Sequence, residues 1–399
     1  MTLLVGVVAL AQRTAVSGTV RDAKTGEKLA QVSVMADGSG EAVVTNEDGA
    51  FTLKTDQKVE TLVVSYVGYH TRRISVKEGG DKPLDIRLTS AVVQLNEVVV
   101  WTSDPRQLVR IAMDKIPANY SRQPELMECF YRETAMKRQN YIYVAEGVVD
   151  MYKTSYNRGV GRDRVAIRKG RRLLSPRQKD TLSVKVIGGP VQSVQLDVVK
   201  NSQFLLNVEE LSYYDFKLLP SQMIDDREQF VVAIEPLIPQ PYALYYGRFY
   251  IDRETMAFTR VELQLDMSDR DKATNYMLVR KPFGVRFRPK ELSLLIDYKL
   301  GADGLTRISY VRNTFRFNCD WKRRLFATSF TAVCEMVVTD RAAEVHPIDG
   351  RQSFDSRDAF YDKVDFFRDP DFWRDYNIIE PSESLDRAID KLVKRHTAK

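Results

Sequence analysis

The chain has 399 residues, of which 44% are hydrophobic and 29% are charged, so a wholly disordered protein is excluded. The length suggests about two or three domains. The formal net charge of +6 fits weak attraction to anionic surfaces, but it is too diffuse to indicate nucleic-acid binding, and no nucleic-acid partner is expected.

The first residues resemble part of a secretory signal. Leu3–Leu10 is a short apolar run, and Ala9-Leu10-Ala11 resembles a small-x-small cleavage site, although no cationic region precedes the run. The alternative is a first buried strand. We expect residues 1–12 to be a signal-peptide-like segment of a periplasmic or envelope protein. No run of about 18 apolar residues occurs, so no transmembrane segment is expected.

Residues 13–101 are predicted to form a seven-strand β-sandwich, because short β-patterned runs alternate with turn signals. In the turn Asn46-Glu47-Asp48-Gly49, the glycine suits a backbone position with positive φ, and Phe51 returns to the core. The candidate strands are Val16–Arg21, Gln31–Met35, Glu41–Thr45, Ala50–Lys54, Thr61–Tyr66, His70–Val76 and Leu84–Leu88.

The same region resembles a known module. Its motifs are Gly18-Thr19-Val20 with Asp22 and Gly26, Thr45-Asn46-Glu47-Asp48-Gly49-Ala50-Phe51, Val64-Ser65-Tyr66-Val67-Gly68-Tyr69 and Leu95-Asn96-Glu97-Val98-Val99-Val100. In this order they are similar to the carboxypeptidase-regulatory-like domain. The resemblance implies a non-catalytic sandwich of the transthyretin or immunoglobulin type. It also implies association with the outer membrane of a Bacteroidetes-type bacterium.

Residues 102–122 are predicted to be a helical connector. Asp104 suits the N-cap and Pro105 the first helical position. Apolar residues then fall on one helix face, and Pro117 should end the helix. We expect this helix to pack on the second domain.

Residues 123–345 are predicted to form a large antiparallel β domain, since long strand-like runs follow one another with short connections. One helix is expected at Pro190–Gln203. The strand-like runs are Met127–Lys137, Asn140–Tyr152, Tyr245–Asp252, Ala257–Met267, Val285–Tyr298, Thr306–Phe317 and Leu325–Val338.

One hairpin of this domain resembles a second family. Tyr246-Gly247-Arg248-Phe249-Tyr250-Ile251-Asp252, followed by Phe258-Thr259-Arg260-Val261-Glu262, is similar to the repeated hairpin of outer-membrane lipoprotein carrier proteins. That resemblance implies an unclosed half-barrel around a helical plug. The two-part arrangement resembles Bacteroidetes carboxypeptidase-like regulatory domain-containing proteins. The expected fold class is therefore mainly β, with a few helices.

The tail, residues 346–399, combines an aromatic and acidic segment with a C-terminal helix. Asp358, Asp362 and Asp365 have helical spacing, which predicts a solvated helix face; calcium binding is the less favoured alternative. In the last helix, apolar residues share one face and should dock on the second domain. These residues are Leu385, Ala388, Ile389, Leu392 and Val393.

No pattern of an enzyme is found. The histidines, His70, His346 and His396, belong to no HExxH or related pattern, so zinc catalysis is not expected. Neither a G-x-S-x-G elbow nor a phosphate-binding glycine loop occurs. We expect no catalytic residue, no metal site and no cofactor.

The cysteines are predicted to be buried free thiols. If Cys319 lies opposite about Phe326 in a hairpin, Cys334 lies on the order of 26 Å further along the strand. A disulfide needs Cα atoms within about 7 Å.

The strongest local bias is a basic stretch between Asn157 and Asp180. One interpretation is a patch for an anionic glycan, a lipid headgroup or an acidic protein. The other is an exposed hairpin or edge strand that its positive charge protects against pairing. The patch would consist of Arg158, Arg162, Arg164, Arg168, Lys169, Arg171 and Arg172.

Apolar rows on the long strands suggest a second candidate site. If the sheet curls without closing, its concave face could hold a lipophilic ligand; alternatively, helices fill the concavity. The lining would include Phe315, Phe317, Trp321, Phe326 and Phe330. The first hypothesis is thus a non-enzymatic structural or binding protein whose partner is another envelope protein, a glycan or a lipid. The alternative is a carrier or sensor of a lipophilic ligand.

Overall fold

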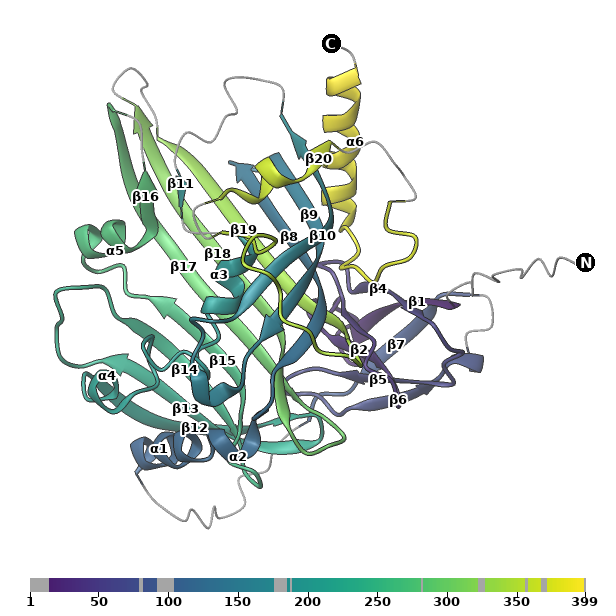
Figure 1. Cartoon of the computed structure of the whole chain (residues 1–399), viewed down its shortest axis with the longest axis horizontal. Helices are drawn as coiled ribbons and strands as arrows, with labels where there is room; N and C mark the ends of the chain where they lie inside the picture. The colour runs from purple at the N-terminus through teal and green to yellow at the C-terminus, as the bar shows by residue number, and fades with distance from the viewer. Residues whose placement is uncertain are drawn as a thin grey trace, which may run out of the picture.

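The computed structural model describes residues 14–78, 82–91, 104–175, 185–186, 189–280, 283–321, 327–355, 358–366 and 372–397. The signal-like segment 1–12 lies outside these residues. The fold is mainly β, as predicted, and consists of a small sandwich packed against a large open sheet (Figure 1).

The N-terminal sandwich has the expected seven strands in two sheets. One sheet has the order β4 (Ala50–Thr55), β1 (Thr14–Asp22), β7 (Leu84–Leu88), and the other has the order β3 (Ala42–Val44), β2 (Ser33–Ala36), β5 (Thr61–Ser65), β6 (Arg72–Ser75). Burial alternates along β4 because every second side chain faces the sandwich core. Gly49 has φ +70°, and a Cβ there would lie 2.5 Å from the Val20 carbonyl oxygen, so the predicted turn requires glycine.

The large sheet contains a run of antiparallel neighbours and does not close. Its order is β12 (Tyr214–Ile224), β13 (Arg227–Pro236), β14 (Tyr245–Asp252), β15 (Phe258–Leu265), β17 (Val285–Leu300), β18 (Thr306–Trp321), β19 (Thr328–Arg341), β8 (Glu125–Lys137), β9 (Asn140–Lys153), β10 (Arg164–Leu174) and β20 (Asp365–Phe366). Only the β10–β20 pair in this sheet is parallel. A separate pair joins β11 (Lys185–Val186) to β16 (Leu278–Arg280).

The meander is permuted relative to the chain order, because β19 pairs with β8. In space, β8, β9 and β10 therefore lie beyond β19, although they come first in the chain. β12 and β13 were not predicted, whereas β10 lies in the basic stretch for which an exposed hairpin or edge strand was one interpretation. The hairpin register also differs from the expectation, since Cys319 lies opposite Thr328 rather than Phe326. A shift of two residues keeps every side chain on its face. The three cysteines are buried free thiols, as predicted.

Short helices cover one face of the large sheet, which we call the inner face (Figure 1). They are α1 (Pro105–Asp114), α2 (Ile116–Asn119), α3 (Pro190–Gln195), α4 (Val208–Leu211) and α5 (Arg270–Met277). Asp104 caps α1 as predicted, accepting a hydrogen bond from the Arg106 amide at 2.9 Å. Two expectations were wrong. Pro117 lies in the first turn of α2 instead of ending the helical region, and the helix from Pro190 ends at Gln195.

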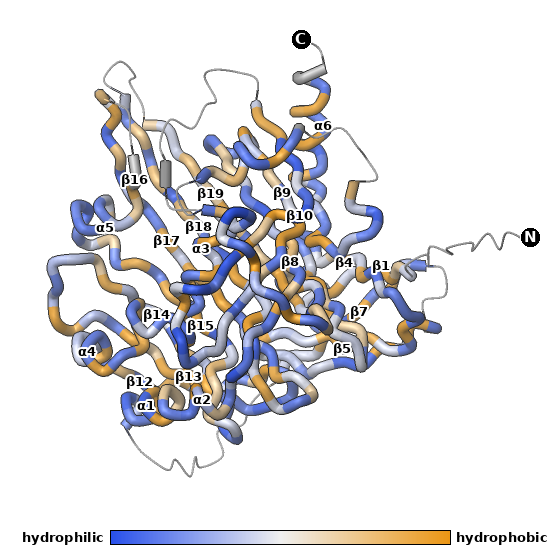
Figure 2. The backbone as a smooth tube through the Cα atoms, in the orientation of Figure 1, coloured by the Kyte–Doolittle hydropathy of each residue, from blue (hydrophilic) through white to orange (hydrophobic). Residues whose placement is uncertain are grey.

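The sandwich and the C-terminal segment cover the opposite, outer face. Val44 of the sandwich packs there with Phe130, Tyr310 and Trp373 in one buried cluster. Helix α6 (Glu383–Thr397) docks its apolar side on β9 and β10, as expected. Figure 2 shows hydrophobic residues alternating with hydrophilic ones along the strands, as is typical of a sheet with one apolar face and one more polar face.

The acidic part of the tail is not the predicted helix. Phe360–Lys363 is a 3-10 turn, and Asp365 lies in the short strand β20. Within the described ranges, no helix combines the length and apolar character needed to cross a membrane.

Candidate functional site

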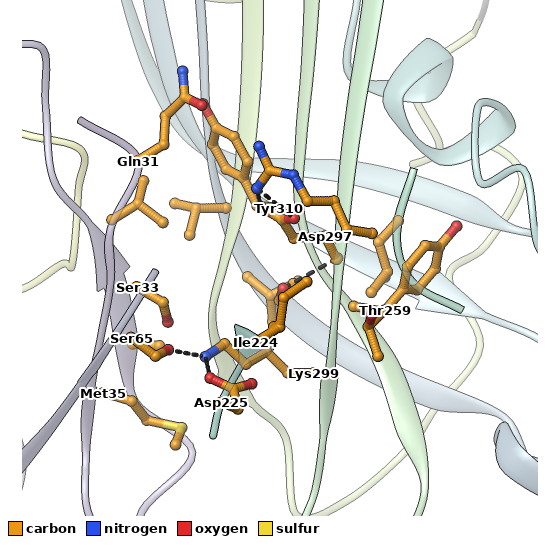
Figure 3. A pocket seen from close by; sticks show the side chains of 18 of the residues that line it. Gln31, Ser33, Met35, Ser65, Ile224, Asp225, Thr259, Asp297, Lys299 and Tyr310 are labelled. Atoms are coloured by element: carbon orange, nitrogen blue, oxygen red, sulfur yellow. Dashed lines mark hydrogen bonds and ion pairs between the residues drawn. The ribbon is translucent and has the colours of Figure 1, made fainter. Parts of the chain in front are cut away.

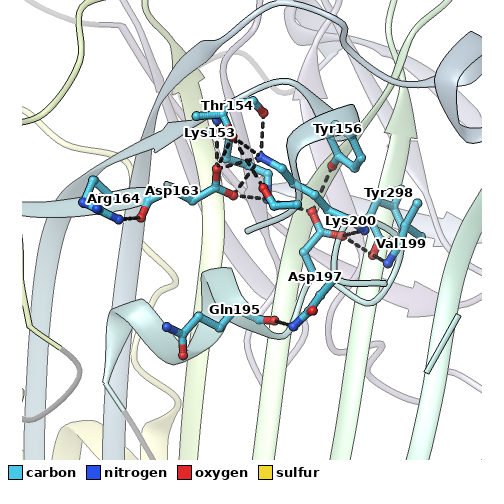
Figure 4. Close-up of polar contacts among 12 residues, drawn as sticks. Lys153, Thr154, Tyr156, Asp163, Arg164, Gln195, Asp197, Val199, Lys200 and Tyr298 are labelled. Atoms are coloured by element: carbon cyan, nitrogen blue, oxygen red, sulfur yellow. Dashed lines mark hydrogen bonds and ion pairs between the residues drawn. The ribbon is translucent and has the colours of Figure 1, made fainter. Parts of the chain in front are cut away.

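The inner face carries a buried group of charges that we call the lysine–aspartate cluster: Lys153, Asp163, Asp197 and Lys200 (Figure 4). Lys153 is the last residue of β9, Asp163 precedes β10, and the other two follow α3. The Lys153 ammonium lies 2.7 Å from Asp197 and 3.6 Å from Asp163. The Lys200 ammonium donates to both carboxylate oxygens of Asp163, at 2.6 and 2.9 Å. All four residues are at most 8% exposed.

Neighbouring groups satisfy the remaining polar atoms. Asp197 accepts hydrogen bonds from the hydroxyls of Tyr156 at 3.0 Å and Tyr298 at 2.8 Å. Lys200 also donates to the Thr154 carbonyl at 2.6 Å. The ring of Tyr120 packs on Tyr156 with centroids 4.8 Å apart. Paired charges with complete hydrogen bonding are the form in which ionised groups tolerate burial.

The cluster lowers the pKa of both Asp197 and Lys200, for different reasons. Burial alone would raise the pKa of Asp197, but the Lys153 ammonium and the two tyrosine hydroxyls hold it below the ordinary range. Burial, followed by repulsion from Lys153, lowers the pKa of Lys200 to about 8. A lysine of this pKa suits nucleophilic chemistry, but Lys200 is 2% exposed and surrounded by its acceptors. The cluster therefore fixes the segment after α3 to the inner face.

The sequence analysis missed this cluster, although one signal was present. One face of β9 carries Val149, Met151 and Lys153 at every second position, so a lysine ends an otherwise apolar row. Its partners lie far away in sequence, with Asp197 separated by 44 residues. Charge and spacing alone could not have paired them.

The predicted cavity residues pack against one another on the inner face. Phe315, Phe317 and Phe330 are at most 3% exposed. The Phe317 ring lies 5.6 Å from Phe330, and Trp321 lies 6.2 Å from Phe330, between ring centroids. Trp321 is half-buried, and Phe326 lies outside the described residues.

Some of the predicted patch residues are exposed and make surface contacts. Arg158 and Arg162 are exposed. Arg164 donates to the carbonyls of Gly161 and Asp163, at 3.1 and 2.9 Å. Arg168 pairs with the carboxylates of Asp150 and Glu128.

The other patch residues hold the C-terminal segment. Lys169 donates to the Phe372 carbonyl at 2.8 Å, and its ammonium lies 4.1 Å from that ring. Arg171 pairs with buried Glu146 at 3.2 Å and stacks on Trp373, 4.9 Å from its centroid. Arg172 donates to the Tyr361 carbonyl. Five of the seven patch residues thus have partners within the chain: Arg164, Arg168, Lys169, Arg171 and Arg172.

A small pocket lies between the sandwich and the outer face (Figure 3). Its volume is about 80 Å³, which has room for a few water molecules. The Lys299 ammonium points across it and donates to Ser65 of the sandwich at 2.6 Å and to Asp225 at 2.8 Å. Arg260 and Asp297 form a second pair at 3.0 Å. The contacts of Lys299 beside this pocket therefore link the sandwich to the large sheet.

An exposed apolar surface lies at the β13–β14 connection. We call it the apolar loop patch: Val208, Leu237, Ile238 and Tyr242, which are 62%, 59%, 46% and 42% exposed. The Leu237 amide donates to the Tyr213 carbonyl at 2.8 Å. The Tyr242 hydroxyl donates to Glu210 of α4 at 2.8 Å, which links the loop to that helix. The run Pro236-Leu237-Ile238-Pro239 was a signal that the sequence analysis left unused.

Metal ligands do not gather in groups of three or more anywhere in the part of the chain that the structure describes. The comparison with family models assigns the first part of the chain, matching residues 16–100 to the CarboxypepD_reg-like domain. Residues 16–100 are a CarboxypepD_reg-like domain. The resemblance proposed from the sequence motifs is thereby confirmed, and it covers less than a quarter of the chain.

Other comparisons give only distant likenesses. No curated protein is significantly similar to the chain in sequence. A DUF1329 family protein from Desulfovibrio piger is 10% identical at a TM-score of 0.24, covering 61% of this chain and 96% of its own. A LolA superfamily protein from Nitrosomonas europaea is 13% identical at a TM-score of 0.22, covering 58% and 94%. A chain of the Pseudomonas aeruginosa MucA/MucB complex is 14% identical at a TM-score of 0.18, covering 58% and 93%. TM-scores this low carry no argument about function.

The CarboxypepD_reg-like domain is joined to the large sheet by backbone and side-chain contacts. The Gly68 amide donates to the Met223 carbonyl at 2.8 Å. The Thr71 amide donates to the Asp226 carboxylate at 3.0 Å. With the Lys299 contact, these bonds fix the domain against the end of β12.

Proposed function

We propose that the protein is a non-catalytic binding protein of the periplasm or cell envelope, associated with the outer membrane. The large sheet is the scaffold, and the apolar loop patch docks another envelope protein. The observation that supports this proposal is the exposed apolar surface formed by the β13–β14 connection and α4 at one end of the sheet. Contiguous exposed apolar surface commonly marks a protein interaction site.

The patch has features suited to docking. Pro236, Pro239 and Pro241 restrict the loop, so less conformational entropy is lost when a partner binds. The Tyr242–Glu210 hydrogen bond holds the loop against α4. Tyrosine and large aliphatic side chains also supply the buried centre of many interfaces.

Native mass spectrometry of protein purified from its own envelope tests the proposal. We expect a larger complex with the wild type and loss of that complex in Leu237→Asp/Ile238→Asp. The matched control is Ser202→Asp/Gln203→Asp, which adds the same charge at exposed positions nearby. A complex that survives in the loop variant, or no complex in the wild type, would contradict the proposal.

A carrier of a lipophilic ligand is the second candidate. The observation that favours it is the aromatic group on the inner face, in which Trp321 remains half-buried. In the same spectra, a small bound mass that disappears in Trp321→Ala would support the carrier. Its absence from the wild type would argue against this candidate.

A further inference from the structure

Basic residues gather where β17 begins and where β8 ends, at the end of the large sheet that is at the top of Figure 1. We call this the basic rim: Lys137, Arg138, Arg286, Arg288, Lys290 and Arg316. The strand register brings these residues into neighbouring rows, since Pro289 pairs with Phe317, Phe317 with Phe330 and Phe330 with Lys137. Neighbouring strands are about 4.8 Å apart, so this row spans roughly 15 Å from β17 to β8.

Part of the positive charge on this rim is not neutralised within the described structure. Arg288 pairs with Asp320, and Arg316 pairs with Glu291 at 3.3 Å. Arg138, Arg286 and Lys290 are exposed and form no ion pair with any residue that the structure describes. Exposed cations without a nearby acid create a local positive potential.

An apolar side chain projects beside these cations. Phe283 lies just before β17 and is 101% exposed. Gly284 follows with φ +79°, so the backbone turns sharply just before β17. A fully exposed phenylalanine beside several cations is the combination that binds membrane interfaces, with apolar contact and headgroup attraction acting together.

We propose that the basic rim binds the surface of an anionic phospholipid bilayer. Arg138, Arg286 and Lys290 contact lipid phosphates, and Phe283 enters the boundary between headgroups and acyl chains. Charge complementarity favours an anionic bilayer as the binding surface, and a bilayer interface can bury the exposed ring of Phe283. This inference goes beyond the proposed protein docking, because it uses a different surface from the apolar loop patch.

Vesicle flotation tests the proposal with the full chain. One vesicle preparation contains phosphatidylcholine alone, and the other contains equal amounts of phosphatidylcholine and phosphatidylglycerol. We expect binding to the anionic vesicles that weakens as salt rises, because salt screens exposed charges. Since each cation near an anionic surface contributes about fivefold, Arg286→Glu/Lys290→Glu should weaken partitioning by at least roughly 25-fold.

The matched control is Lys24→Glu/Lys58→Glu, which changes the net charge equally at exposed positions of the sandwich. Control binding should remain within about threefold of the wild type, because charges further than a Debye length act weakly. Phe283→Ser should weaken binding by roughly tenfold, through loss of apolar burial. Circular dichroism checks that each variant is folded.

Two results would overturn the proposal. One is equal loss of binding in the rim and control variants, which would show a non-specific charge effect. The other is absence of wild-type binding to anionic vesicles, including the case in which the rim instead binds an acidic protein. Either result leaves the apolar loop patch and its mass-spectrometric test unaffected.

Discussion

Asp197 is a member of the lysine–aspartate cluster that holds the segment after α3 against the inner face. Its carboxylate accepts from one ammonium and two tyrosine hydroxyls while 0% exposed. Removing one member of a buried ion pair leaves the other charge uncompensated in a medium of low dielectric constant. The contribution of this residue to stability is therefore much larger than that of a surface pair.

Asp197→Asn should lower the free energy of unfolding by about 3–5 kcal/mol, since the Lys153 charge stays buried. Urea denaturation measures the change. Asp37→Asn serves as the control, because it breaks an exposed pair with Arg73 and should cost at most about 1 kcal/mol. Equal effects of the two substitutions would contradict this account of the cluster.

Acid should destabilise the protein through its buried carboxylates. The pKa of Asp197 lies below its ordinary value of 3.8, and that of Glu146 lies below 4.5 because Arg132 and Arg171 outweigh the effect of burial. The unfolded chain therefore binds more protons at acid pH. The stabilisation is complete above about pH 5 and is lost as the pH falls through and below the ordinary values.

Urea denaturation at a series of pH values measures this effect, and the free energy of unfolding should fall from about pH 5 downward. In Asp197→Asn the fall should be shallower, because one of the two carboxylates is gone. The same slope in both proteins would show that Asp197 does not carry this dependence.

At the scale of elements, a pair of glycines allows the C-terminal segment to reach the inner face. Gly147 of β9 pairs with Gly170 of β10. A Cβ at Gly147 would lie 2.7 Å from Phe360, and one at Gly170 would lie 2.3 Å from Val364. Because neither glycine has a side chain, there is space for Phe360 of the 3-10 turn and for Val364, which follows that turn.

Gly170→Ala should destabilise the protein by about 1–3 kcal/mol through overpacking. Thermal unfolding measures the change. Gly161→Ala is the matched control, because nothing lies within 4 Å of its Cβ position. Adding Val364→Ala to Gly170→Ala should restore part of the loss; no recovery would mean that another contact is responsible.

The sequence predicted elements better than it predicted their partners. Alternating short runs identified the sandwich strands, because half-buried strands show a period of two. An edge strand was one interpretation of the stretch that contains β10, but its partners were not predicted, since Lys169 and Arg171 contact residues near 372 that local pattern cannot show. Phe315, Phe317 and Phe330 lie on the inner face, because parity survives a register shift of two residues.

At the scale of the whole molecule, the C-terminal segment joins the three layers. Phe360 and Val364 pack on the inner face, β20 follows the β10 edge, and Trp373 packs on the outer face. Asn377 then pairs with the sandwich strand β4 through its side-chain amide. It accepts from the Lys54 amide at 2.7 Å and donates to the Lys54 carbonyl at 2.8 Å.

Asn377→Ala should loosen the sandwich from the sheet, because both bonds to Lys54 are lost in a position that is 2% exposed. We expect a loss of about 1–3 kcal/mol and faster amide exchange along β4. Hydrogen exchange read by mass spectrometry measures both the rate and its location. Faster exchange spread evenly over the protein would instead indicate a global effect.

Because Asn377 follows β4 by more than 300 residues, its contacts with that strand can form only late in synthesis. The sandwich leaves the ribosome first, and the free edge of β4 gains its cover only when Asn377 arrives, more than 300 residues later. Until then a strand edge is open to pairing with other chains. A nascent chain of this protein therefore passes through a long interval in which this strand edge is exposed to aggregation.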